Sequence, residues 1–271
     1  MAVASIGRVV PAWQGPLLYV EYSWTWYKRS WRSTIVSSVV NPLLLLLSLG
    51  VGMSIFLGSN PKIAEFTGGV SYLVWLAPAL MTTAALQTAT FESTYPILAN
   101  FQWVRIYQGI NATPLSSRQI AGGTLLWIAL RAFSVSAVFA VIATLLGAVH
   151  SWAVIPAVLC STLGAMAFSV LVVAFAVTRV DKQPGFEVVF RLIMMPMMLF
   201  AGTYYPVETL PVWAKAIAWV TPLWHSTELS RGLSLGTLDP LSALGHLTYL
   251  VLLIVLGTWA TMRLFVKELE K

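Results

Sequence analysis

Six apolar runs, separated by polar or charged segments, set the pattern of this 271-residue chain. Each run is close to the roughly 20 residues that an α-helix needs to cross the hydrocarbon of a bilayer. The pattern therefore predicts an all-α integral membrane protein that forms one transmembrane domain over residues 1–271. The expected spans are residues 35–57, 70–91, 122–149, 152–178, 187–205 and 240–262.

Residues 20–33 precede the first span and have the period of an amphipathic helix. Such a helix lies in the headgroup region of a membrane. A plain aromatic and basic anchor is the simpler alternative. One predicted face carries Val20, Trp24, Tyr27 and Trp31, and the other carries Glu21, Thr25, Lys28 and Arg32.

Residues 206–232 stay apolar but are interrupted by prolines. A helix over residues 211–220 would be only about 15 Å long, which is too short to cross the membrane. A second helix fits residues 222–231, with Pro222 at its first position and Gly232 just past its end. Two short helices in a row predict a re-entrant hairpin on the outer side, where protein or a cavity must satisfy the backbone. A surface loop with two amphipathic turns is the alternative.

The charge balance fixes the expected orientation. Only 10% of the residues are charged, against roughly 25% in a soluble domain. The net charge is +6, but the basic residues lie between the apolar runs and form no continuous patch for nucleic acid. With six spans both termini share one side, and that side receives 12 basic residues against 3 on the other. This excess predicts that both termini are cytoplasmic.

The residues that usually carry chemistry are sparse. The chain has no Gly-Lys pair, so a phosphate-binding loop is absent. His150, His225 and His246 are scattered without the spacing of metal ligands. We therefore expect no catalytic, cofactor-binding or metal site in this chain. A membrane-embedded glycosyl or acyl transferase has no support.

Two charges within the apolar runs call for a partner. Arg131 lies about two turns inside the third span, where an unpaired charge is costly. Glu92, at the end of the antiparallel second span, is the nearest candidate by topology, so we predict a buried charge pair. Direct contact with a transported molecule is the alternative. An ion-coupled secondary transporter or channel would need more such groups near the middle of the membrane.

The segment between the second and third spans is too polar to cross the membrane. A short helix over residues 100–111 should lie in the cytoplasmic interface, followed by a turn through Thr113 and Pro114. A connector that only covers the headgroups is the alternative. The expected helix carries Phe101, Trp103, Val104 and Tyr107.

At two places the residues also resemble a known family. The sequence resembles membrane subunits of ABC-type exporters, the kind that export polysaccharides, nodulation lipooligosaccharides and daunorubicin-like drugs. The segment 112–116 is similar to the loop after their coupling helix. The later match consists of a small-residue turn, an aromatic-proline pair, a leucine-proline-tryptophan run, a proline break and an arginine-glycine end. Its residues are Ala201, Gly202, Tyr205, Pro206, Leu210, Pro211, Trp213, Thr221, Pro222, Leu223, Arg231 and Gly232.

This resemblance implies a permease subunit in a bacterial plasma (inner) membrane that works by alternating access. Two copies of a separate ATPase would bind ATP and Mg, and a second permease copy would complete a homodimer or related heterodimer. The substrate would be a lipid-linked glycan, a lipooligosaccharide or an amphipathic drug-like molecule. Residues 100–111, with Thr113 and Pro114, would couple to the ATPase, and the interfacial helix would contact it too.

The resemblance also implies a central pathway with apolar and aromatic walls. A methionine-rich lining would adapt to an amphipathic molecule, while ordinary helix packing is the alternative for the methionines. The expected pathway and gate residues are Met197, Phe200, Tyr204, Tyr205, Trp213 and Trp224.

Overall fold

The computed structural model describes residues 10–35, 40–53, 61–149 and 151–271. Within these ranges all regular secondary structure is helical, as predicted. The long helices are α1 (Gln14–Ile35), α5 (Tyr72–Glu92), α8 (Ser117–Leu145), α9 (Val154–Val177) and α13 (Pro240–Leu269). The shorter α-helices are α2 (Asn41–Leu45), α4 (Pro61–Thr67), α6 (Tyr95–Leu98), α7 (Ile106–Asn111), α10 (Met195–Phe200), α11 (Val212–Val220) and α12 (Pro222–Leu235).

Among the elements that lie fully within the described residues, three are wound as π-helix and one short segment is a 3₁₀-helix. The π-helices are η2 (Leu46–Gly52), η3 (Ala99–Trp103) and η4 (Val188–Met194), and the 3₁₀-helix is η5 (Val207–Thr209). Each π-helix continues directly from or into an α-helix. These π-helices lie in the first and fifth predicted spans and in the segment before the third predicted span.

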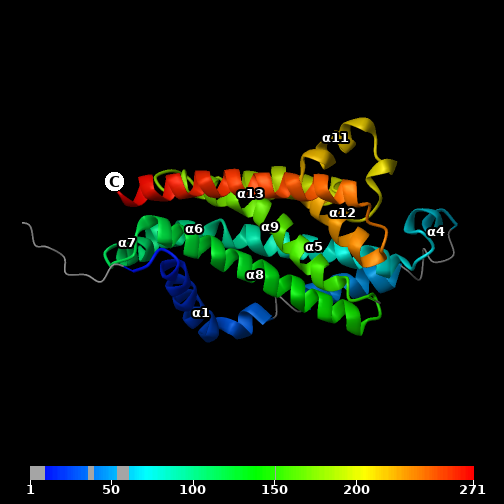
Figure 1. Ribbon diagram of the computed structural model, residues 1–271, viewed down its shortest axis with the longest axis horizontal. Helices are drawn as coiled ribbons and strands as arrows, with labels where there is room; N and C mark the ends of the chain where they lie inside the picture. Colours follow the sequence, from blue (N-terminus) through cyan, green and yellow to red (C-terminus); the bar gives the residue numbers. More distant parts are fainter. Residues whose placement is uncertain (1–9, 36–39, 54–60, 150) are drawn as a thin grey trace, which may run out of the picture.

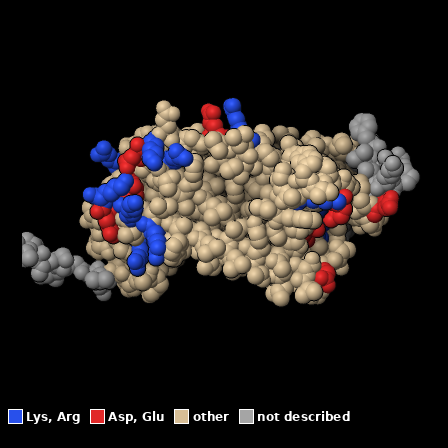
Figure 2. All heavy atoms as spheres, turned by 90° about the horizontal axis from the view of Figure 1, so that it is seen from above, with Lys and Arg blue, Asp and Glu red and all other residues tan. Residues whose placement is uncertain are grey.

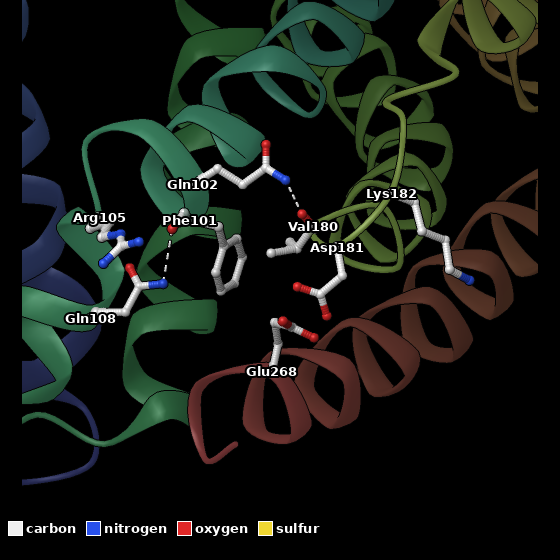
Figure 3. A pocket seen from close by; sticks show the side chains of 8 residues that line it. All are labelled: Phe101, Gln102, Arg105, Gln108, Val180, Asp181, Lys182 and Glu268. Atoms are coloured by element: carbon white, nitrogen blue, oxygen red, sulfur yellow. Dashed lines mark hydrogen bonds between the residues drawn. The ribbon is translucent and has the colours of Figure 1, made fainter.

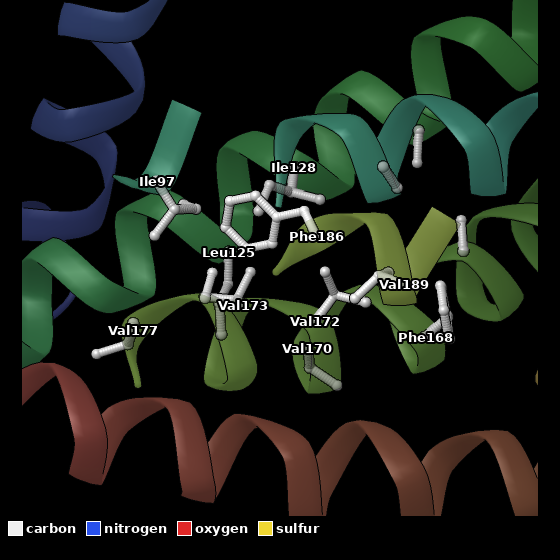
Figure 4. Packing of buried hydrophobic residues seen from close by; sticks show 14 of the residues in the cluster. Ile97, Leu125, Ile128, Phe168, Val170, Val172, Val173, Val177, Phe186 and Val189 are labelled. Carbon is white, nitrogen blue, oxygen red and sulfur yellow. The ribbon is translucent and has the colours of Figure 1, made fainter. Parts of the chain in front are cut away.

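Helix α9 is the centre of the bundle, because it contacts α5, α8, α12 and α13. Figure 1 shows α5, α8, α9 and α13 running lengthwise, with α1 and α7 at one end and α4 and α11 at the other. The valines of α9 pack beside Leu125 and Ile128 of α8 and beside Phe186, which follows α9 (Figure 4). At Gly164 a Cβ atom would collide with the side chain of Ser226 on α12. Small residues therefore allow the helices to approach closely, as in other membrane bundles.

Three helices of the described residues are long and apolar enough to cross a membrane: α8, α9 and α13. Helix α5 has 21 residues, and three of its threonine side chains bond to carbonyl oxygens of their own helix. Thr83 and Thr90, for example, donate to the carbonyl oxygens four residues earlier, at 2.9 and 2.7 Å. The fold is that of a multi-pass membrane protein.

Several helix ends differ from the predicted ends. Helix α8 begins at Ser117 rather than at 122, because Ser116 and Gln119 form a capping box. Helix α13 continues to Leu269, and residues 61–67, expected in a loop, form α4. The fifth apolar run is helical only to Phe200. The first span, residues 35–57, falls partly outside the described residues.

The two helices of residues 206–232 are present, but the second is longer than expected. Thr221 caps α12 by accepting a hydrogen bond of 3.4 Å from the backbone N–H of Trp224. The prediction that Gly232 ends this helix is wrong, since α12 continues to Leu235. Gly236, with φ of 69°, ends the helix instead. A glycine in this left-handed conformation is the usual helix stop.

Charged side chains divide the surface along the long axis. Figure 2 shows Lys and Arg gathered at the end that holds α7 and the C-terminal end of α13. A smaller mixed group lies at the opposite end, and the surface between is nearly free of charge on the face shown. This distribution matches an apolar belt between two polar ends.

Candidate functional site

Helix α1 is held against the bundle by a face other than the predicted one. Tyr19 and Ser23 are buried, while Trp24 is half exposed. The close approach depends on Gly123 of α8, where a Cβ atom would lie 2.5 Å from the Cβ of Tyr19. The side chain of Gln119 also donates to the carbonyl oxygens of Val10 and Pro11, both at 3.1 Å. The helix is thus anchored to α8 and does not merely rest in the headgroups.

The residues predicted for the interfacial helix are only partly brought together. Trp24 and Tyr27 stack with ring centroids 5.7 Å apart, and the ammonium of Lys28 lies 5.6 Å from the ring of Trp24. The assignment of Trp24 and Lys28 to opposite faces is wrong, because residues four apart share a side of a helix. The side chains of Trp31 and Arg32 lie outside the described part of the structure.

The predicted helix over residues 100–111 is broken in two by Arg105. This residue adopts the left-handed conformation, with φ of 54°, between η3 and α7. A non-glycine residue in this conformation is uncommon and marks a fixed turn. The rings of Phe101 and Tyr107 meet edge to face at 4.7 Å, and both contact Phe265 of α13. The break therefore folds this segment onto the end of α13.

The residues predicted to couple to a partner fall into two groups, one buried and one exposed. Phe101 and Tyr107 are buried at 2% and 0% exposure, so they position the segment and have no surface to offer. Trp103 and Val104 are 65% and 61% exposed at the turn. Thr113 and Pro114 are also exposed. The outward face of this segment thus carries two large apolar side chains, Trp103 and Val104, next to the exposed Arg105.

A groove runs beside this segment (Figure 3). Its volume is about 680 Å³. It is lined by Phe101, Gln102, Arg105, Gln108, Val180, Asp181, Lys182 and Glu268. The amide of Gln102 donates to the carbonyl oxygen of Val180, and that of Gln108 donates to Phe101 at 2.9 Å. Three elements far apart in sequence, η3, the connector after α9 and the end of α13, thus share one polar hollow.

The ammonium of Lys271 joins two of the carboxylates that line this groove. It lies 2.7 Å from Oδ2 of Asp181 and 2.6 Å from Oε2 of Glu268. The hydrogen bond to Asp181, with a second to Glu268, raises the pKa of Lys271 above its ordinary value. The pair is exposed, so its role is to hold the end of α13 near the connector and not to supply much stability.

The two charges within the apolar runs form a pair. Nε of Arg131 lies 3.1 Å from Oε1 of Glu92, and Nη1 donates to the hydroxyl of Tyr27 at 3.0 Å. The guanidinium also lies 4.7 Å from the centroid of the Tyr27 ring. This network links α5 and α8 to α1. A buried charge is tolerable only with such partners.

The network opens into a second hollow, which sequence reasoning missed. This aromatic cavity, of about 800 Å³, lies between α1, α5, η3 and α8. Besides Glu92, Arg131 and the residues of the apolar walls, it is lined by Tyr19, Tyr22, Trp26, Tyr27, Phe91, Tyr107, Trp127, Gln87, Thr88 and Asn100. The amide of Gln87 donates to the sulfur of Met198 at 3.2 Å. One wall of the cavity is thereby joined to α10.

At the opposite end, Arg231 of α12 forms a second buried network. Its side chain is buried and its Nη2 donates to the carbonyl oxygen of Gly202 at 2.7 Å. Nε donates to the carbonyl of Trp75 at 3.3 Å, and the guanidinium lies 3.7 Å from the Trp75 ring. Glu228 balances the charge at 3.2 Å. Arg231 thus ties α12 to α5 and to the turn after α10.

Two histidines that looked scattered are also adjacent. The Nδ1 atoms of His225 and His246 are 2.8 Å apart, which joins α12 to α13. Nε2 of His225 lies 2.9 Å from the carbonyl oxygen of Trp219. The ring of His225 stacks on Tyr249 at 3.9 Å, and the hydroxyl of Tyr249 donates to Val220 at 2.5 Å. No group of three or more metal-ligating side chains occurs in the described residues.

The predicted pathway residues do not form a single wall within the chain. Met197 is buried in the core, whereas Phe200 and Trp213 make their own pair at 5.6 Å. Trp224 packs against the two histidines. Tyr204 accepts a hydrogen bond from Tyr72 at 2.8 Å, and Tyr205 donates to Leu199 at 2.6 Å.

Together, the long apolar helices and the amphipathic helix anchored against them define a multi-pass membrane protein. The sequence model of the ABC-2 type transporter family matches residues 17–235. The chain belongs to this family, as a permease. Such a permease is a transport subunit that works with an ABC ATPase.

Curated relatives support this membership over most of the chain. Nodulation protein J of Rhizobium leguminosarum bv. viciae is 28% identical over 211 residues, which is 78% of each chain. The protein of the same name from Neorhizobium galegae is 29% identical, over 90% of each chain. That of Bradyrhizobium diazoefficiens is 27% identical, over 92% of this chain and 94% of the relative.

Proposed function

We propose that this chain is the permease subunit of an ATP-driven exporter that moves an amphipathic molecule out of the cytoplasm. The substrate class is a lipooligosaccharide or a related lipid-linked glycan. The relatives named as nodulation proteins support this class. The aromatic and methionine-rich interior suits an amphipathic molecule.

The proposed topology has six spans with both termini in the cytoplasm of a bacterium, in its plasma (inner) membrane. The excess of basic residues on the side of the termini supports it. Helices α11 and α12 would then form a re-entrant hairpin on the outer side. The length of α11, 9 residues, supports this placement because it is too short to cross.

The observation that carries the proposal is the turn at Arg105. It presents Trp103 and Val104 outward at the end where basic residues gather, while the two aromatic rings behind them are locked into the core. We assign residues 100–111 as the segment that receives force from the ATPase. Closure of two ATPase chains, which would bind ATP and Mg, would bias a pair of permeases between inward and outward states. An ion-coupled carrier would need ionisable groups near the middle of the spans, and Glu92 and Arg131 neutralise each other.

The test replaces the exposed apolar turn. The double variant Trp103→Ala, Val104→Ser should insert and fold as the wild type does, because both side chains are exposed. It should lose copurification of the ABC ATPase and also lose ATP-dependent export. Trp152→Ala, at the other end and 87% exposed, is the matched control and should keep both. Copurification and export at the wild-type level in the double variant would refute the assignment.

A further inference from the structure

We propose that the aromatic cavity between α1, α5 and α8 binds an amphiphile whose headgroup is uncharged and rich in hydroxyl groups, as a sugar is. This inference rests on the proposed function for the class of molecule, and it adds the place and the charge of the headgroup. The cavity of about 800 Å³ has the size of ordinary small-molecule sites.

The walls of the cavity suit a molecule with one apolar and one polar part. Trp26, Tyr22 and Phe91 line it and remain 67%, 42% and 57% exposed, so their rings have unoccupied faces. Tyr27 of α1 and Trp127 of α8 add a further aromatic pair, with ring centroids 5.8 Å apart. Aromatic rings bury a large apolar area against ligands of different shapes. They can therefore pack against both an acyl chain and the apolar face of a sugar.

The polar side chains of the cavity favour an uncharged headgroup over a charged one. Glu92 and Arg131 are the charged side chains that line the cavity, and they neutralise each other at 3.1 Å. Arg131 also donates to Tyr27. A charged headgroup would have to separate this pair and leave one partner uncompensated, which is costly in a poorly solvated site. Gln87, Thr88 and Asn100 supply amide and hydroxyl groups that match sugar hydroxyls without any change of charge.

The position of the cavity fits a ligand that enters from the headgroup region. One wall is the amphipathic helix α1, and another is η3 with the start of α7, beside the proposed ATPase-binding turn. The deep wall includes Gln87, which contacts Met198 of α10. A molecule in the cavity would thus touch both the segment that receives force and the helix that continues the fifth apolar run.

Photo-crosslinking of the full-length chain in phosphatidylcholine nanodiscs tests the site. The probe is an octyl glucoside with a diazirine in its alkyl chain, and octyl phosphate and octyl phosphocholine with the same diazirine are the comparisons. We expect the glucoside to label peptides of α1 and α8. Thr88→Trp, which fills the cavity, should reduce this labelling about tenfold, which corresponds to ~1.4 kcal/mol of binding free energy. The two other probes should label these peptides weakly.

The controls separate binding from folding and from transport. Thr248→Trp places the same side chain on an exposed part of α13 and should leave labelling unchanged. Trp26→Ala removes an exposed ring and should weaken labelling even if Thr88→Trp proves unstable. Labelling of α13 as strongly as of α1, or insensitivity to both cavity variants, would overturn the site. Equal labelling by all three headgroups would mark an ordinary lipid contact and overturn the selectivity. These measurements need no ATPase, so export tests the proposed function separately.

Discussion

Nη2 of Arg231 donates a hydrogen bond of 2.7 Å to the carbonyl oxygen of Gly202, 29 residues earlier in the chain. Gly202 has φ of 74°, and the turn it forms ends the fifth apolar run. One buried guanidinium therefore fixes the relation between this turn and α12. The contact couples two parts of this end of the bundle that no backbone hydrogen bond joins among the described residues.

Arg231→Lys should loosen this end of the bundle. A lysine keeps the charge but has no planar fork to reach the carbonyls of Gly202 and Trp75 together or to stack on the ring. We expect a loss of about 1.5–3 kcal/mol in the free energy of unfolding, as for other hydrogen bonds to charged groups. Thermal melting followed by tryptophan fluorescence measures the loss. Lys215→Met, which removes a charge from α11, is the control. Equal melting temperatures of the two variants would show that the contacts of Arg231 do not stabilise the chain.

Glu92 and Arg131 should behave as one unit in a double-mutant cycle. Glu92→Gln and Arg131→Met should each destabilise the chain by about 3 kcal/mol, because each leaves a mostly buried charge without its partner. The double variant should recover part of the loss. Strictly additive losses would contradict the coupling. The exposed Asp181–Lys271 pair is the comparison, and its cycle should give about 1 kcal/mol or less.

Accessibility to a thiol reagent should distinguish the two ends of the bundle. In a Cys160→Ala background, Thr237→Cys precedes α13 at the outer end, and Thr113→Cys lies in the turn before α8. Both threonines are exposed. A membrane-impermeant maleimide added to intact cells should label the first and not the second, and both should react after lysis. Labelling of Thr113→Cys in intact cells would reverse the proposed topology.

The hairpin of α11 and α12 should report its depth in the membrane. Spin labels at Ile217 and Val220 lie on the exposed apolar side of α11, at 40% and 71% exposure. We expect oxygen to relax them more efficiently than a water-soluble nickel chelate does, because oxygen concentrates in the hydrocarbon. A label at Thr237 should show the opposite preference. Access of the nickel chelate to both α11 sites throughout the ATP cycle would make the hairpin a surface loop.

The parts of the fold that depend on local composition were predictable. Apolar runs indicate helices that are long enough to cross a membrane, so α8, α9 and α13 match their predicted spans within a few residues at one or both ends. The partnership of Glu92 with Arg131 followed from antiparallel neighbours and from the cost of a lone charge. These arguments need only the sequence near each residue and the order of the spans.

Side-chain contacts between residues far apart in the chain could not be predicted from the sequence. Arg231 looked like a charge at a helix end, because its partners are carbonyl oxygens, which any residue possesses. His225 and His246 lie 21 residues apart on different helices, so spacing could not pair them. The packed face of α1 was also missed, because a close approach at Gly123 decides it and apolar periodicity does not. The aromatic cavity is formed by side chains of several elements and could not be foreseen for the same reason.

The three π-helical segments give this bundle a discrete way to move. A π turn holds one residue more than an α turn, and the two forms differ only in whether each N–H bonds five or four residues back. Moving that extra residue along a helix turns the side chains it passes by roughly 100°, the angle that one residue spans. In η4, which continues into α10, such a slip would turn the side chains of the fifth apolar run, including the buried Val189, without breaking the helix. The bundle could then alternate between two packed arrangements in single-residue steps and need not bend.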